Sequence, residues 1–316
     1  MVEPDMLTYL LAVLAVAAQP SDLLDEARAR ARAGDFEGAA LVSAEAMRTP
    51  GDHVRQAQYL HALALEYGGS LELALVEYDA LLASWPADTP SDDVVFRRAE
   101  TLGRLGEWRR AQQGLRALGD PALRPLGDQV KIGVLYALWD LERGRERRGL
   151  RALDELLDRM PATASPFYQA AARARLAELA VASADTIVFR GSDSQRARQL
   201  EERSTYVVMA KEQLEEIIRL DEIAHTLPAL LSVAQAHEQF ATALLRETPP
   251  RRLSDEETAR YRDQLSERAV ALLLKTLRYY TKAVEYAESR GWTGEPLPAL
   301  NAGVERVRTR IERLDP

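Results

Sequence analysis

One short phrase returns four times in the first half of this chain. It consists of a glycine, one variable residue, a third residue that is usually large and apolar, two further variable residues and a small residue. The four copies begin at Gly34, Gly69, Gly106 and Gly144, and they end at Ala39, Ala74, Ala111 and Gly149. The final small residues recur after 35, 37 and 38 positions. Repeats of this length are typical of solenoids of helix pairs, which usually bind other molecules rather than transform them.

The composition agrees with a helical solenoid. Aromatic residues make up only 6% of the chain, and β-branched runs are scarce among the many Ala, Leu, Arg and Glu residues, which favour helices. We therefore expect an all-α fold, a right-handed solenoid of antiparallel helix pairs. Four repeats should cover residues 20–161, and a continuous region with longer helices should cover residues 162–316.

Each position of the phrase has a physical role. The small residues allow two helices to cross closely, and the glycines end the first helix of each pair in a left-handed conformation. The large apolar residues fill the wedge between the helices of one pair; they are Phe36, Leu71 and Trp108. Prolines such as Pro86 and Pro161 end the second helix.

This pattern resembles the tetratricopeptide repeat family, which implies a protein-binding superhelix. The resemblance is incomplete in two respects. Alanine stands where the family usually has a glycine in the first helix, and the fourth copy has Glu146 in place of a large apolar residue; the alanines are Ala62, Ala99 and Ala137.

Longer helices are expected after the fourth repeat. The Ser165-Pro166 pair should begin a helix that runs to about 184, and others are expected over about 194–221, 226–248, 254–289 and 298–314. Ser254 and Glu257 have the spacing of a capping box, and Gly291 should end the longest helix.

Part of this second half resembles the C-terminal region of repeat proteins from myxobacterial and related envelopes, some of which serve gliding motility. The matching segments are Ala234-x-x-His237-Glu238-x-Phe240-Ala241, Thr248-Pro249-Pro250, Tyr261-Arg262 and the Gly291-Trp292 break. The resemblance implies a non-enzymatic component of an envelope complex.

The N-terminus suggests export. Residues 7–18 form an uncharged apolar run that is too short to span a bilayer comfortably and that contains Ala15-Val16-Ala17, a small-x-small cleavage pattern. We expect a signal peptide over 1–19, no membrane span in the mature chain, and a periplasmic location that is peripheral at the outer membrane. The segment before the run contains Glu3 and Asp5 but no basic residue, so a buried first helix in a cytoplasmic protein remains the alternative.

No catalytic, metal or cofactor site is expected. The chain has no cysteine, which excludes thiolate catalysis and zinc–thiolate sites. His237-Glu238 lacks the second histidine of a metalloprotease motif, and no glycine-rich phosphate loop is present. With a net charge of −8 and basic residues interleaved with acidic ones over 142–151, nucleic acid is disfavoured as a partner.

The first helices of the repeats should line a concave groove for a peptide. We expect this lining to include Gln56, Tyr59, Leu63, Tyr67, Phe96, Arg104, Lys131 and Val134. The alternative is that the N-terminal helix or the long C-terminal helices fill the groove. A clamp of asparagines for a carboxylate is excluded because the only asparagine is Asn301.

The sequence thus favours a protein-interaction scaffold or adaptor in a bacterial cell-envelope complex, with motility or secretion as candidate processes. The alternative is a cytoplasmic repeat module that binds a peptide or regulates a partner. A hydrolase of the cell wall is a third and weaker hypothesis.

Overall fold

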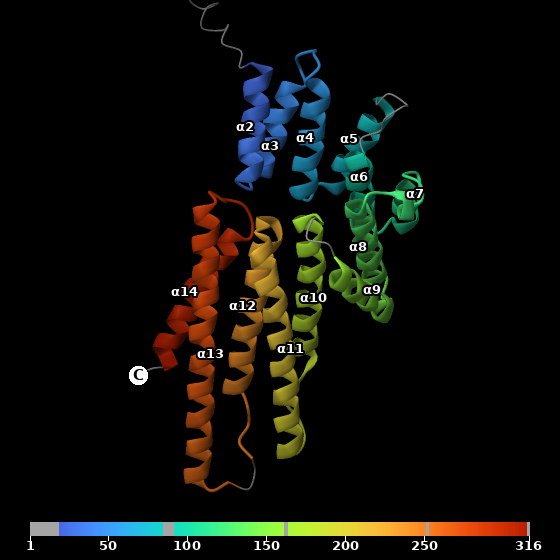
Figure 1. Ribbon diagram of the computed structural model, residues 1–316. Coiled ribbons are helices and arrows are strands. Elements are labelled where there is room, and N and C mark those ends of the chain that lie inside the picture. The colour runs from blue at the N-terminus through green and yellow to red at the C-terminus, as the bar shows by residue number, and fades with distance from the viewer. Residues whose placement is uncertain (1–18, 85–91, 161–163, 251–252, 315–316) are drawn as a thin grey trace, which may run out of the picture. The chain divides into compact units, whose positions relative to one another are not determined.

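The computed structural model describes residues 19–84, 92–160, 164–250 and 253–314, which form helices and no strands (Figure 1). The chain divides into two compact units, Met1–Gly119 and Asp120–Pro316, called here the N-terminal and C-terminal units. The expected signal peptide lies outside the described residues, apart from Gln19.

The N-terminal unit consists of three consecutive helix pairs. Each helix packs against the next along the chain; the helices are α2 (Pro20–Arg32), α3 (Phe36–Ala46), α4 (Val54–Tyr67), α5 (Leu71–Ser84), α6 (Asp92–Arg104) and α7 (Trp108–Arg116). Alanine is the most frequent buried residue of this unit, and Tyr78 and Leu81 are the largest fully buried side chains of α5.

The C-terminal unit begins with one pair of similar size and continues with longer helices. Its elements are a short 3-10 turn η1 (Pro121–Leu123), α8 (Leu126–Glu142), α9 (Glu146–Arg159), α10 (Pro166–Thr186), α11 (Asp193–Leu220), α12 (Ile223–Leu245), α13 (Asp255–Ser289) and α14 (Leu297–Leu314). Helix α13 has 35 residues. The prediction of an all-α helical-repeat fold with longer helices in the second half is confirmed.

The repeated phrase occupies the predicted turns. Its four glycines, Gly34, Gly69, Gly106 and Gly144, all have positive φ angles of 73–83°. The four small residues are all buried, and the last one lies at a close helix crossing. A Cβ atom on Gly149 would lie 2.6 Å from Cγ of Leu141 and 2.9 Å from the backbone oxygen of Ala137.

The ring of Phe36 stacks on Tyr67 of the following pair, with 5.5 Å between centroids, so this residue contacts the next pair. One local prediction needs correction. Helix α12 begins at Ile223 rather than near Thr226, so that Pro228 lies inside the helix instead of in its first turn. Proline is typical of the first turn of a helix because it lacks the N–H that a helix interior needs, yet α12 continues through Pro228.

Candidate functional site

A stripe of side chains runs along α4, the first helix of the second pair. Gln56, Tyr59, Leu63 and Tyr67 lie three or four positions apart, so they share one face, whereas Ala57, Ala62 and Ala64 are buried. Gln56 is exposed and the other three are half-buried. We call these four residues the α4 stripe.

The two tyrosines of the α4 stripe are held by neighbouring helices. The Tyr59 hydroxyl donates a hydrogen bond to Asp93 of α6, and its ring lies 6.5 Å from the ring of Tyr78. Tyr67 stacks on Phe36, and the guanidinium carbon of Arg97 lies 5.5 Å from its ring centroid. Burial raises the pKa of Tyr67 to about 12, so it stays a neutral phenol. Both rings therefore have fixed positions.

A buried carboxylate lies beside the stripe. Glu66 is only 1% exposed, and Oε2 accepts a 2.6 Å hydrogen bond from the Tyr78 hydroxyl. The guanidinium groups of Arg97 and Arg104 lie 3.9 and 3.7 Å from Oε1. Burial, together with the nearby charge of Glu100, raises the pKa of Glu66 to about 7 despite these cations.

Four of the eight predicted lining residues come from α6 and α8 rather than α4. Arg104 is exposed and donates a 3.2 Å hydrogen bond to the backbone oxygen of Glu66. Lys131 is half-buried, 3.9 Å from Asp128 and 5.9 Å from the centroid of the Tyr168 ring. Lys131 belongs to the C-terminal unit, whereas Arg104 belongs to the N-terminal unit.

Phe96 and Val134, the other two predicted lining residues on α6 and α8, are buried. Phe96 is 1% exposed and Val134 is 0% exposed, so neither side chain offers a surface to a partner. Phe96 shares its helix face with Ala99 and Gly103, which are also buried. Helical spacing alone did not show which of two apolar faces packs inward.

A second surface, in the C-terminal unit, was not predicted. Helices α11 and α13 both pack on α12, and between them lies a groove of about 760 Å³. Its floor is Phe240 and Leu244 of α12. The α11 wall uses positions spaced by three and four residues, namely Ala197, Leu200, Glu201, Ser204, Thr205, Val208, Met209 and Glu212, and the α13 wall uses Arg268, Ala271, Leu272 and Lys275. We call this the α11–α13 groove.

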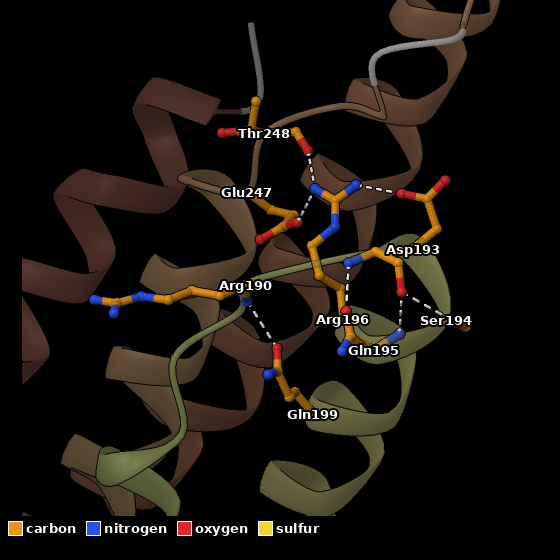
Figure 2. A network of polar contacts seen from close by, with 9 residues as sticks. Arg190, Asp193, Ser194, Gln195, Arg196, Gln199, Glu247 and Thr248 are labelled. Carbon is orange, nitrogen blue, oxygen red and sulfur yellow. Dashed lines mark hydrogen bonds and ion pairs between the residues drawn. The ribbon is translucent and has the colours of Figure 1, made fainter.

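One end of the α11–α13 groove is fixed by polar contacts (Figure 2). Arg196 at the start of α11 donates a 2.7 Å hydrogen bond to Glu247 and another to the backbone oxygen of Thr248, both just beyond α12, and it pairs with Asp193. Ser192 caps α11 through a reciprocal capping box with Gln195. These bonds join the start of α11 to the end of α12, so the α11 wall is held against the floor helix there.

A buried histidine lies one helical turn before Phe240. His237 stacks on Tyr279 of α13 with 5.3 Å between ring centroids, and neither ring nitrogen has a hydrogen-bond partner among the described residues. Burial and the charges of Lys275 and Lys211 lower the pKa of His237 to about 4, so the ring is neutral near pH 7. It therefore acts as a packing side chain at neutral pH.

Within the described residues, no group of three or more histidine, aspartate or glutamate side chains is arranged to hold a metal ion. None of the described helices combines the length and the apolar character needed to cross a membrane.

Comparisons with known proteins return distant similarities to solved structures. No protein-family model matches the chain, and no curated protein matches it. A solved structure of Naa15/Naa10 bound to HypK-THB is similar over 98% of this chain, with 18% identity and a TM-score of 0.36, and this chain spans half the length of that one. A circular tandem repeat protein with a novel repeat topology is similar over 93% of this chain and 71% of its own, with 18% identity and a TM-score of 0.19.

Proposed function

We propose that this protein is a non-enzymatic scaffold or adaptor that binds a segment of a partner protein along the α4 stripe. The observation that carries the proposal is the fixed position of Tyr59 and Tyr67 beside the exposed Gln56. Asp93 holds the first ring, and Phe36 and Arg97 flank the second. Aromatic side chains that are already ordered lose little conformational entropy when a partner binds, which favours affinity.

The stripe also offers mixed chemistry for an extended or helical peptide. Leu63 supplies apolar surface between the two tyrosines, and the exposed Arg104 supplies a cation on the neighbouring helix α6. A partner segment with one or two large apolar residues and a carboxylate would match this combination.

We place the scaffold in the bacterial cell envelope, exported to the periplasm and peripheral at the outer membrane, in a complex for motility or secretion. The apolar run over residues 7–18 with its Ala15-Val16-Ala17 pattern supports export. The resemblance of the second half to envelope repeat proteins supports the process. The second candidate, a cytoplasmic peptide-binding module, is favoured by the absence of a basic residue before the run.

Location and binding are tested separately. N-terminal sequencing of the protein from fractionated cells should give a mature chain that begins near Gln19 in the periplasmic or outer-membrane fraction. An intact Met1 in the cytoplasmic fraction would overturn export and select the second candidate, while the scaffold role would stand.

Binding is tested by crosslinking and pull-down from native cells with stripe variants. We expect Gln56→Trp and Leu63→Glu to lose the partners that the unmodified chain recovers. The matched control is Val76→Glu, because Val76 is 62% exposed on α5 and lies outside the stripe. Circular dichroism should show that all three variants are folded. Unchanged recovery with both stripe variants would move the binding surface elsewhere.

A further inference from the structure

The α11–α13 groove is a second surface with no occupant among the described residues. It lies in the C-terminal unit, whereas the α4 stripe belongs to the N-terminal unit. Val208 and Met209 on its α11 wall are each 48% exposed, although they are large apolar side chains. Removing the exposed part of such side chains from water would be favourable. An uncovered apolar wall of this kind indicates an interaction site.

The shape of the groove fits a helix rather than an extended strand. Its walls are two helices and its floor is a third, α12, so an added helix would complete a four-helix arrangement around Phe240 and Leu244. A bound strand would find no sheet edge there to pair its backbone N–H and C=O groups, whereas a helix satisfies these groups internally.

The length of the groove sets the length of the occupant. From Ala197 to Glu212 the α11 wall extends about 22 Å at the helical rise per residue, which corresponds to a helix of about 15 residues, or four turns. A smaller hollow of about 250 Å³ continues the groove toward Tyr261 and Pro250, where the Arg196 contacts fix its end.

The two walls carry opposite charges. Glu201 and Glu212 line the α11 wall, and Arg268 and Lys275 line the α13 wall. All four are exposed, and none forms an ion pair with another described residue. A helix lying between the walls is complementary when its edge facing α11 is basic and its edge facing α13 is acidic. Its apolar ridge would then lie over the floor. The chain's own apolar run over residues 7–18 has no charged residue, so it does not match these walls.

We propose that the α11–α13 groove binds an amphipathic helix of about 15 residues from a partner protein, whose apolar ridge is flanked by Lys or Arg on the edge facing α11 and by Asp or Glu on the edge facing α13. This inference does not depend on the α4 stripe.

The test uses three designed 15-residue helical peptides that share one apolar ridge. Their two edges are basic and acidic, both basic, or both acidic, and each peptide carries a fluorophore. Fluorescence anisotropy with the full chain should show that the mixed-edge peptide binds at least about tenfold more tightly than either of the others, a difference of about 1.4 kcal/mol. Equal binding of all three would overturn the proposal.

A charge exchange makes the test specific to the two walls. The double variant Arg268→Glu/Lys275→Glu makes both walls acidic, so its preference should move to the peptide with two basic edges. Reversal of these charges without a change of preference would contradict the proposal even if the peptides bind.

Substitution in the apolar wall locates the binding. Val208→Asp should abolish binding of the mixed-edge peptide, and Ile218→Asp should not, because Ile218 is similarly exposed on α11 but does not line the groove.

Two outcomes would assign other occupants to the groove and overturn the proposal. Dimers of the unmodified chain that Val208→Asp dissociates would indicate a second copy, and stronger peptide binding after Leu10→Asp/Leu14→Asp would indicate the chain's own N-terminal run.

Discussion

The hydroxyl of Tyr78 on α5 donates a 2.6 Å hydrogen bond to the carboxyl group of Glu66 on α4, and both side chains are almost completely buried. The guanidinium nitrogens of Arg104 and Arg97 lie 3.7 and 3.9 Å from Oε1 of Glu66, which exceeds normal hydrogen-bond length. A carboxylate here is therefore incompletely compensated, which explains why burial raises its pKa to about 7.

Stability should depend on pH through Glu66. Its pKa is raised on folding, from 4.5 to about 7, so its contribution to the free energy of unfolding is fully present below pH 4.5 and is lost as the pH rises through 7. We expect urea unfolding to show lower stability at pH 8 than at pH 5 from this group. Glu66→Gln should remove that part of the dependence, because glutamine is neutral throughout.

The control for this prediction is Glu72→Gln on α5, because Glu72 is exposed. It should retain the pH dependence of the unmodified chain. A Glu66→Gln variant whose stability changes between pH 5 and pH 8 as in the unmodified chain would show that Glu66 titrates normally.

Gly149 should not tolerate even one added methyl group. The Cβ of alanine would meet Leu141 and the backbone of Ala137, and backbone cannot move aside cheaply. We expect Gly149→Ala to destabilise the chain by about 1–3 kcal/mol in chemical denaturation. Gly114→Ala on α7 is the comparison, because its nearest neighbour is the end of Arg98 at 3.6 Å. The Gly114→Ala substitution should be neutral or slightly stabilising. Equal losses of stability in the two variants would contradict a close helix crossing at Gly149.

At Gly69 the cost of adding a side chain depends on backbone conformation and not on space. Nothing lies within 4 Å of a Cβ placed there, but the residue has a φ of 83°. Gly69→Ala should therefore cost about 1–2 kcal/mol through strain alone. Gly127→Ala on α8, which also has open space but an ordinary φ, should cost nothing or stabilise the helix. Thermal unfolding of the pair tests this, and a neutral Gly69→Ala would contradict it.

Arg306 and Glu238 should be energetically coupled. Two nitrogens of Arg306 on α14 lie 2.9 Å from the two carboxylate oxygens of Glu238 on α12, and Tyr280 of α13 donates to the same carboxylate at 3.2 Å. Because Arg306 is half exposed, solvent screens the pair, and a double-mutant cycle should give about 1 kcal/mol. The exposed pair Arg260–Glu256 on α13 should give a smaller value. A coupling energy no larger than that of the control pair would mean that the two hydrogen bonds between Arg306 and Glu238 are not maintained in solution.

Much of the local structure could be predicted from the chain itself. Ser254 and Glu257 form the expected capping box, and α13 ends before Gly291, whose φ is 64°. These features depend on hydrogen bonds and backbone angles within a few residues, so the sequence pattern specifies them. Helix α12 begins at Ile223, three residues before the expected start, and it includes Pro228, which a rule based on local sequence assigns to the first turn.

The candidate surfaces could be predicted only in part. Helical spacing predicts that the α4 stripe shares one face. The same spacing predicts that Phe96 and Val134 line the groove, but both side chains are buried in the structure. Spacing shows that residues share a face, and it does not show whether another helix covers that face.

The sequence by itself determined the helix pairs and their turns, because glycines with positive φ and small crossing residues are constraints that act on the chain locally. Only the tertiary structure decided which faces stay uncovered. The packing of α11 and α13 on opposite sides of Phe240 creates a groove from residues far apart in the chain, and the burial of Glu66 beneath Tyr78 sets its pKa. Both depend on the distances between helices, which no local pattern encodes.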